Sequence, residues 1–449
     1  MLFVFGFGFV ACDRRTDEEK NFTYPSSADA IYGNGGLAVR KGNYVYFVNG
    51  YKSINSSSVS KDATYNVGSL LLMKLGENGK VVTNENGLLK DDYYITMSNQ
   101  LCGYEATDLF IHGDYLYFVT PCLENEKGDK VWAKERVVFN RIKLDKKGKV
   151  EEVYSSGVKL DSLEYKYYVS NGSLNILVWE KGASYYAENG NNALIRVDAV
   201  AKTSSVVAND VLEVEFAKNH NEIFFRTQTE NSHYLKQYNV IGNETSNYNV
   251  FDKTFEIVGV EDGKVFVSMT HSVGSSKDIK SSKISTKSGF ELVYAYEGTQ
   301  EISITPNGDV VLVSGTQITL VKSKDETIII NDEGATTIKV LDFTNGCILF
   351  HSTTTENSTL KLVSYSNALA GNDVEIKTLT TFAVVEDSYA YFDLNEEENM
   401  LYFFKLSGDD YYLHRIKVNN NLGDTEEMFG VYESGDEPVV EEEEEIEEE

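Results

Sequence analysis

Residues 302–330 read ISITPNGDVVLVSGTQITLVKSKDETIII. The stretch contains short runs rich in Ile, Val and Thr, at residues 302–305, 310–314, 317–321 and 326–330. β-Branched residues fit the pleated surface of a sheet. Asn307-Gly308 lies between two of the runs and is a strong hairpin signal, because such a turn needs positive φ angles. The stretch therefore predicts one antiparallel sheet of about four strands.

The same arrangement recurs along the chain as a strand, a tight polar turn and a second strand rich in apolar and aromatic residues. The turns are Gly42-Asn43, Gly113-Asp114, Asn171-Gly172, residues 219–221, Asp262-Gly263, Asn307-Gly308, Asn345-Gly346 and residues 395–399. A third and a fourth strand follow in most units, with a period of about 40–50 residues late in the chain. This pattern is typical of propeller blades. We predict an all-β fold, a single β-propeller of about eight four-stranded blades, or seven if one unit is irregular.

Physical arguments favour a closed ring. A lone four-stranded sheet cannot bury both faces, and its edges expose unpaired backbone groups. Stacking blades around an axis buries the faces, and closing the ring protects the edges. An array of two-sheet sandwiches is the alternative fold. In general pattern the chain resembles propeller domains of bacterial surface lipoproteins over residues 32–434, although Trp-Asp repeats, paired kelch glycines and sialidase boxes are missing.

The chain opens with MLFVFGFGFVAC and then turns polar. The apolar run is shorter than the ~20 residues that span a bilayer, and it has the length of a signal-peptide core. Phe9-Val10-Ala11-Cys12 resembles the lipobox of bacterial lipoproteins, a family in which the signal is cut before the Cys and the Cys takes a lipid anchor. The family usually has Leu where Phe9 stands and basic residues before the apolar run, and this sequence departs at both points. The alternative is a buried N-terminal strand with an ordinary Cys.

The lipobox resemblance implies a division of the chain. Residues 1–11 would be a signal peptide, residues 12–31 the lipid-anchored Cys12 with a polar tether, and residues 32–434 the propeller. Residues 435–449 are mostly Glu, and a block of like charges is expected to be disordered and solvated. The expected location is the cell membrane, with the protein anchored by lipid and facing the exterior.

Charge and cysteine usage limit the partners. The net charge of -29 argues against nucleic acid, because a phosphate backbone needs clustered Lys and Arg. Cys102 and Cys122 flank a predicted hairpin, so a disulfide between them is one interpretation in an oxidising exterior. Spacing alone does not establish that bond. Cys347 lies in an apolar run and is expected to be a small buried residue.

The connections between strands indicate where a ligand would bind. We label the four strands of a blade A to D in chain order. The A–B and C–D turns lie on one face of the ring, which we call the short-turn face because the A–B turns are short. The B–C loops and the D-to-A links lie on the opposite, long-loop face. Long connections are expected at residues 50–68, 84–106, 121–137, 181–192, 270–280 and 352–358. We interpret residues 84–106 as a D-to-A link and the others as B–C loops, which puts all of them on the long-loop face.

The long loops of the first three blades are rich in aromatic residues. Tyr and Trp supply large, rigid contact areas that dock proteins or stack on sugars. The sequence therefore predicts a binding site for a protein or glycan on the long-loop face. The alternative is that the rings only hold their own loops in place. The candidate residues are Tyr51, Tyr65, Tyr93, Tyr94, Tyr104, Trp132, Tyr185 and Tyr186.

Motifs for catalysis are not found. The sequence lacks a GxSxG elbow, HExxH, a P-loop, a dinucleotide fingerprint and a calcium loop, and its six His are far apart. We therefore predict no metal and no cofactor, and favour a recognition module at the cell surface. One alternative is a structural scaffold of an envelope complex. The least favoured is an enzyme, a glycan hydrolase or lyase with an axial site built from distant residues.

Overall fold

A computed structural model describes the chain in segments. These are residues 36–50, 69–76, 79–82, 94–101, 108–120, 122–124, 130–132, 137–144, 149–158, 162–170, 172–182, 192–217, 221–270, 275–382, 392–395, 399–407, 410–418 and 426–428. Only the backbone is described for residues 94–96, 98–101, 122–124, 130–132, 392–395, 406, 407, 410–412 and 428. The expected signal peptide, Cys12, the tether and the acidic tail lie outside the described residues.

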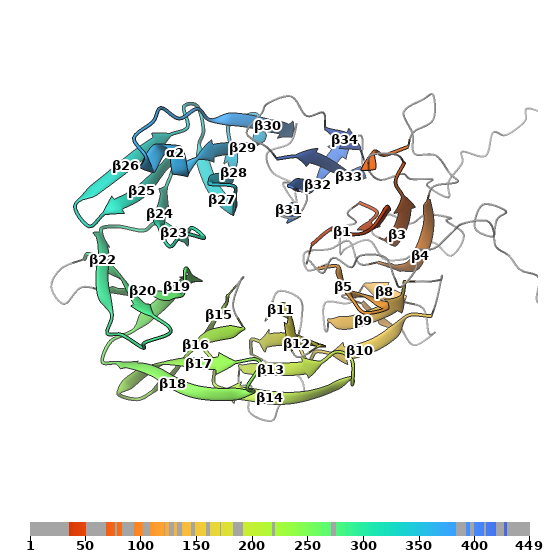
Figure 1. Cartoon of the computed structure of the whole chain (residues 1–449), viewed down its shortest axis with the longest axis horizontal. Coiled ribbons are helices and arrows are strands. Elements are labelled where there is room, and N and C mark those ends of the chain that lie inside the picture. The colour runs from red at the N-terminus through yellow and green to blue at the C-terminus, as the bar shows by residue number, and fades with distance from the viewer. Residues whose placement is uncertain are drawn as a thin grey trace, which may run out of the picture.

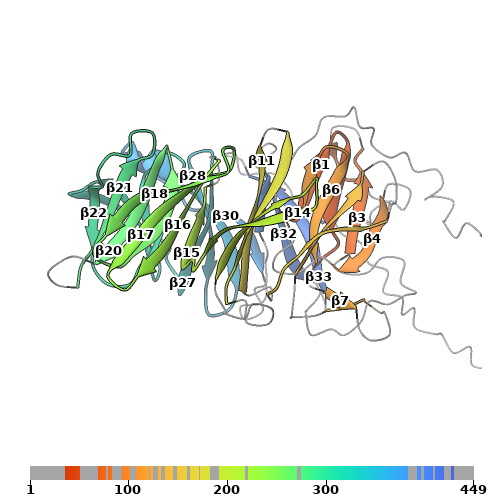
Figure 2. The same ribbon diagram turned by 90° about the horizontal axis from the view of Figure 1, so that it is seen from below.

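The described strands form eight four-stranded sheets and one two-stranded sheet. Figure 1 shows the eight sheets as blades around a central axis, with the first strand of each blade innermost and the fourth outermost. Figure 2 shows the same ring from its edge. The protein is a single all-β propeller. The predicted number of about eight blades is confirmed, and the alternative of separate sandwiches is wrong.

Blades 1 to 4 occupy the first half of the chain. Blade 1 comprises β1 (Ala38–Lys41), β2 (Tyr44–Val48), β3 (Ser69–Lys74) and β4 (Tyr94–Leu101). Blade 2 comprises β5 (Phe110–His112), β6 (Tyr115–Thr120), β9 (Val138–Lys143) and β10 (Glu151–Ser155). Between β6 and β9, β7 (Cys122–Glu124) pairs with β8 (Lys130–Trp132). Blade 3 comprises β11 (Leu163–Ser170), β12 (Ser173–Glu180), β13 (Ala193–Asp198) and β14 (Thr203–Asn209). Blade 4 comprises β15 (Glu213–Phe216), β16 (Glu222–Thr229), β17 (Ser232–Asn239) and β18 (Glu244–Phe251).

Blades 5 to 8 complete the ring. Blade 5 comprises β19 (Phe255–Glu261), β20 (Lys264–Thr270), β21 (Lys277–Lys283) and β22 (Glu291–Tyr296). Blade 6 comprises β23 (Glu301–Ile304), β24 (Val310–Ser314), β25 (Gln317–Ser323) and β26 (Glu326–Asn331). Blade 7 comprises β27 (Thr337–Thr344), β28 (Cys347–Thr353), β29 (Ser358–Ser364) and β30 (Lys377–Phe382), with the short helix α2 (Tyr365–Leu369) between the last two. Blade 8 comprises β31 (Phe392–Asn395), β32 (Met400–Ser407), β33 (Asp410–Lys417) and β34 (Glu427–Met428).

The predicted A–B hairpins are confirmed, and the turn of blade 7 shows why Asn-Gly marks them. Asn345 and Gly346 have φ angles of 47° and 74°, and Thr344 pairs with Cys347 across them. Positive φ at both central positions matches the twist of the flanking strands, and Asn and Gly adopt it at low cost.

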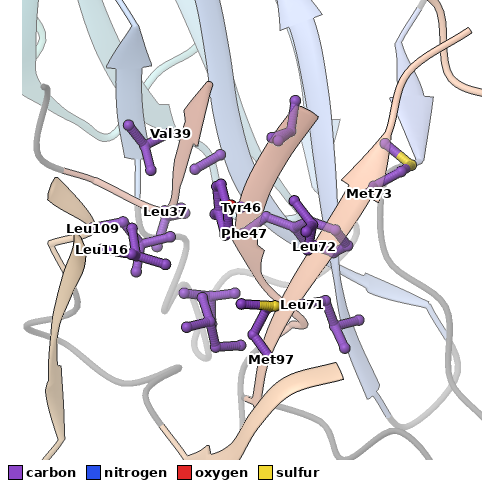
Figure 3. Packing of buried hydrophobic residues seen from close by; sticks show 14 of the residues in the cluster. Leu37, Val39, Tyr46, Phe47, Leu71, Leu72, Met73, Met97, Leu109 and Leu116 are labelled. Atoms are coloured by element: carbon purple, nitrogen blue, oxygen red, sulfur yellow. The ribbon is translucent and has the colours of Figure 1, made fainter. Parts of the chain in front are cut away.

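The second strand of a blade is buried along nearly its whole length. In β12 every residue from Leu174 to Glu180 is buried. Continuous burial replaces the usual alternation of buried and exposed residues, because both faces of a blade pack against neighbouring blades. Cys347, at the start of β28, is 3% exposed within such a core, as expected for a small buried residue. Figure 3 shows the apolar cluster around blade 1.

Among the described strands, the ring closes without exchange between the two ends of the chain. The four strands of blade 1 come from the N-terminal part of the chain, and those of blade 8 come from the C-terminal part. Side chains seal this junction instead. Tyr402, Phe404 and Leu413 of blade 8 join the apolar cluster of blade 1. Arg415 is 4% exposed and donates to the carbonyl oxygen of Gly79 at 3.0 Å.

One expected connection contains a strand. Residues 84–106 were interpreted as a D-to-A link, but residues 94–101 within them form β4, the fourth strand of blade 1. The sequence of β4, YITMSNQL, is largely polar because an outermost strand buries only part of its surface. A search for apolar runs therefore does not recognise it as a strand. Residues 75–93 are therefore a C–D connection, which belongs to the short-turn face.

Several other elements also differ from the prediction. The polar strands β18 and β21 were not predicted, and the connection assigned to residues 270–280 shortens to 271–276 because β21 begins at Lys277. The loop expected at 352–358 is a tight turn in which Thr354 N donates to Asn357 O at 2.8 Å. Helix α2 was also missed. No helix in the described segments has the length and apolar character needed to cross a membrane.

Candidate functional site

A cavity of about 720 Å³ lies at the short-turn end of the central channel. Its wall is formed by the last residues of four consecutive inner strands, β15, β19, β23 and β27. The turn residues Asn307, Asn345 and Asn399 border it, as does the first turn of α2. We call this space the channel cavity. Because each wall strand belongs to a different blade, any site here is assembled from residues far apart in sequence.

A glycine allows two of these strands to approach closely. A side chain added at Gly259 in β19 would place its Cβ 2.6 Å from Cγ1 of Ile304 in β23. The register of β19 also shifts between Ile257 and Gly259, and that of β27 shifts between Val340 and Asp342. Such bulges re-aim side chains at the rims of sheets, and here they lie in strands that line the cavity.

The wall of the channel cavity is acidic. Glu215, Glu261 and Asp342 come from three different blades and all line it. Among the described residues that line it, Lys, Arg and His are absent. Charges of one sign in a cleft with poorly polarisable walls reinforce one another and attract counter-ions. The described part of the wall therefore carries an excess of acidic side chains.

The carboxyl group of Glu215 has a strongly shifted pKa. Burial is the main reason that its pKa is raised to about 7, and Lys166 opposes the rise by its positive charge. The neighbouring carboxylates of Glu213, Glu261 and Glu164 raise the pKa of Glu215 further. The side chain therefore changes charge near neutral pH.

Other bonds hold the surroundings of Glu215 in place. Lys166 donates to the carbonyl oxygen of Ala217 at 3.1 Å, which links blade 3 to the end of β15. Glu213 accepts hydrogen bonds from Arg226 at 3.0 Å and from the backbone N–H of Ile257 at 2.8 Å. Glu213 therefore connects blades 4 and 5.

Replacing Glu215 with Gln is expected to stabilise the protein at pH 8 and to change little at pH 5. The folded state holds the Glu215 proton more tightly than the unfolded chain does. Stability is therefore lost as the pH rises from the ordinary value of 4.5 through about 7. Gln cannot ionise and removes this loss, which is about 2 kcal/mol after allowance for screening of a partly exposed group.

Urea unfolding at both pH values measures the effect. Glu256→Gln is the matched control, because that side chain is 60% exposed on β19. An equal change in the free energy of unfolding at pH 5 and pH 8 would show that burial does not perturb Glu215.

Aromatic rings lie beside the carboxylates. Phe343 and Tyr365 both line the channel cavity, with ring centroids 6.0 Å apart and planes at 89°. Phe216 also contributes to the wall. The faces of aromatic rings attract cations, so these residues add to the effect of the carboxylates.

The site lacks an evident catalytic arrangement within the described residues. No group of three His, Cys, Asp or Glu there is placed to hold a metal ion. His112 and His351 have pKa values lowered by burial, and neither lines the channel cavity.

Most residues of the predicted aromatic site are not described. Tyr51, Tyr65, Tyr93, Tyr104, Tyr185 and Tyr186 lie outside the described residues, as does Cys102. For Cys122 and Trp132 only the backbone is described, and both lie in the small sheet of β7 and β8, paired with each other. This sheet is inserted between β6 and β9, on the long-loop face as expected.

Tyr94 is placed differently from the prediction. It begins β4 and pairs with Met73, next to the last residue of β3. That end of the blade carries the C–D connection, so the placement of Tyr94 on the long-loop face is wrong. The cause is the missed strand β4. Because β4 is the fourth strand of blade 1, the residues before it join the third and fourth strands and lie on the short-turn face.

Sequence analysis missed the acidic residues of the channel cavity. None of Glu215, Glu261 and Asp342 was among the candidate residues of the sequence analysis. The signal that identifies them is positional: each lies near the end of the first strand of its blade, within a few residues of the A–B turn. An acidic residue near the end of an inner strand is therefore a candidate for the wall of the channel.

The sequence matches no protein-family model and no curated protein. In structure, the chain is similar to the β-propeller domain of the Trilobed protease from Pyrococcus furiosus, with 12% identity, a TM-score of 0.45, and coverage of 68% of this chain and 90% of that one. It is also similar to the Dos1 propeller, with 11% identity, a TM-score of 0.45, and coverage of 88% and 95%. TolB from Acinetobacter baumannii gives 13% identity, a TM-score of 0.34, and coverage of 67% and 77%. These likenesses concern the propeller fold alone.

Proposed function

We propose that this protein is a binding module whose ligand carries a positive charge and enters the channel cavity. The observation that supports this proposal is the composition of the wall. Glu215, Glu261 and Asp342 face one space, and no described residue of its wall is basic. Bringing a cation among these carboxylates relieves their mutual repulsion, whereas an anion would increase it.

The size and the apolar part of the wall narrow the ligand class. A volume of about 720 Å³ is within the range of small-ligand pockets. Phe216, Phe343 and Tyr365 provide surface for an alkyl chain or for a cation over a ring face. An amine or guanidinium on an alkyl chain fits both features. We therefore propose a Lys or Arg side chain of a peptide as the ligand.

Short peptides containing Lys or Arg are expected to bind, and replacing both Glu215 and Glu261 with Gln is expected to weaken binding about tenfold or more. The affinity for the wild-type protein should rise between pH 6 and pH 8, because Glu215, with a pKa of about 7, gains its charge in this range. Isothermal titration calorimetry with Lys, Arg and norleucine peptides of equal length measures both effects.

Asp325→Asn is the matched control for loss of a carboxylate. Asp325 is 80% exposed beside Lys324, in the turn between β25 and β26 far from the axis. Equal affinity for the Lys and norleucine peptides, or equal weakening by Asp325→Asn, would refute the proposal.

The long-loop face is a second candidate site, for a protein or a glycan. It is favoured by the small sheet of β7 and β8, which Figure 2 shows projecting beyond the body of the ring. Rigid scaffolds commonly carry their binding residues on such insertions. Hydrogen exchange with a bound partner distinguishes the two sites: protection of β7 and β8 supports this candidate, and protection confined to the short-turn face contradicts it.

We also propose that the protein acts outside the cell, held to the membrane by a lipid on Cys12. The lipobox-like sequence before Cys12 supports this location. Metabolic labelling with a fatty acid tests it. Label on the wild-type protein that is absent from Cys12→Ala supports the anchor, and an unlabelled wild-type protein contradicts it.

A further inference from the structure

Among the described strands, the outermost strand of each blade pairs on one side only, and most of these edges are interrupted. In each of β4, β10, β14, β18, β22 and β30 an extra residue breaks the register with the third strand. β34 has only two described residues. Bulges and short edge strands are known means of preventing one sheet from pairing with another.

β26 lacks this protection. Residues Gln317 to Val321 of β25 pair one by one with Asn331 to Thr327 of β26, in antiparallel order. The irregularity at Lys322 lies on β25. Among the outer strands with more than two described residues, β26 is the only one without an extra residue of its own.

The chemistry of β26 also favours pairing. Its sequence is ETIIIN, so the charged residue Glu326 stands at one end and three Ile occupy the centre. Ile329 is 54% exposed. A regular, apolar, exposed edge strand is a template for adding another strand. Val206 on β14 is similarly exposed at 58%, but its strand carries a bulge.

The backbone of β26 presents hydrogen-bonding groups away from the blade. The N–H of Asp332 donates to the carbonyl oxygen of Thr316 on the β25 side at 3.2 Å. Hydrogen-bonded and non-bonded residues alternate along an antiparallel pair. The N–H and C=O groups of Thr327, Ile329 and Asn331 therefore point outward from the sheet.

We propose that β26 pairs antiparallel with β26 of a second copy of this chain, about a twofold axis through Ile329. In this register Ile329 lies opposite Ile329, Ile328 opposite Ile330, and Thr327 opposite Asn331. Each residue then faces a partner on the same side of the joined sheet, as pleating requires. The outward backbone groups of Thr327, Ile329 and Asn331 all find partners. A twofold contact of this kind is closed, so it gives dimers and no fibres.

Charge does not oppose this register locally. Glu326 would lie near Asp332 of the other copy, but each carboxylate has its own partner. Lys322 lies 2.9 Å from Glu326, and Lys361 lies 2.7 Å from Asp332. The net charge of -29 on each copy still produces long-range repulsion. Added salt screens it, so dimerisation should strengthen with ionic strength. One strand pair buries less than about 1,200 Å², which predicts a weak, reversible dimer.

Sedimentation velocity over a range of protein concentrations, at low salt and at about 0.5 M salt, tests the proposal. We expect concentration-dependent dimers of the full chain that increase with salt. Ile329→Lys and Ile329→Glu should each weaken the dimer about tenfold or more, because the twofold axis places like charges directly opposite each other. An equal mixture of the two variants should form dimers again, since the opposite charges then face one another.

Val206→Lys on the bulged strand β14 is the matched control and should dimerise like the wild type. A wild-type protein that stays monomeric under all conditions would overturn the proposal and leave an extended peptide as the partner of this edge. Dimers that survive both Ile329 variants, or that Val206→Lys abolishes, would overturn it too.

Discussion

Replacing Phe404 with Ala is expected to lower the free energy of unfolding by about 3–5 kcal/mol. Phe404, on β32 of blade 8, is 1% exposed and packs into the apolar cluster of blade 1. Its removal leaves a cavity that a close-packed core fills only in part. The location makes the consequence specific, because the described residues of blades 8 and 1 share no strand and meet through side-chain packing.

The neighbouring residue provides a matched control. Phe403 is 0% exposed and points to the other face of β32, where it contacts Phe382 of blade 7 with ring centroids 5.8 Å apart. Phe403→Ala should cost a similar free energy in urea unfolding. Hydrogen exchange should differ: Phe404→Ala exposes the amides of β1 to β3, whereas Phe403→Ala exposes those of β28 to β30. If both variants gave the same pattern of exchange, blades 8 and 1 would not be a separable junction.

Replacing Asp332 with Ala is expected to cost about 3–5 kcal/mol, because it leaves a buried cation without its partner. Asp332 follows β26 and is 6% exposed. Its two carboxylate oxygens accept hydrogen bonds from Lys361 at 2.7 and 2.8 Å, and Ser352 donates to it at 2.5 Å. Since Lys361 and Ser352 are in blade 7, the carboxylate connects blades 6 and 7.

A double-mutant cycle isolates this pair. Lys361→Met alone should also destabilise the protein strongly, because it leaves Asp332 buried and unneutralised. The combined variant should recover a large part of the loss, since removing both charges of a buried pair is often nearly neutral. Urea unfolding of the four proteins gives the coupling energy. Additive losses in the double variant would mean that the two charges do not depend on each other.

The inner and second strands were predictable from sequence. The run VVLVS at Val310–Ser314 is apolar except for its last residue, and the turn before it carries Asn-Gly, so pattern and turn chemistry agree. The outer strands were harder. β4 and β18 are polar, because the outer edge of a blade has one side open to water, and a polar strand resembles a loop when only hydrophobicity is considered. Missing β4 also reversed the face assigned to Tyr94.

The candidate site was not predictable in the same way. Glu215, Glu261 and Asp342 are separated by 46 and 81 positions in the chain, and each alone resembles an ordinary surface carboxylate. Their partial burial, the raised pKa of Glu215 and the absence of a basic residue among the described wall residues exist only once the blades surround the axis.

The amino-acid sequence by itself determined the blade, because alternation, β-branched residues and Asn-Gly turns act within about 40 residues of one another. It also determined that the blades must assemble, since a lone sheet leaves apolar faces in water. Only the tertiary structure decided which carboxylates share the channel cavity, how side chains join blade 8 to blade 1, and which of the described outer edges lacks a bulge of its own. The physical reason is that these features depend on distances between blades, which local propensity and turn chemistry do not specify.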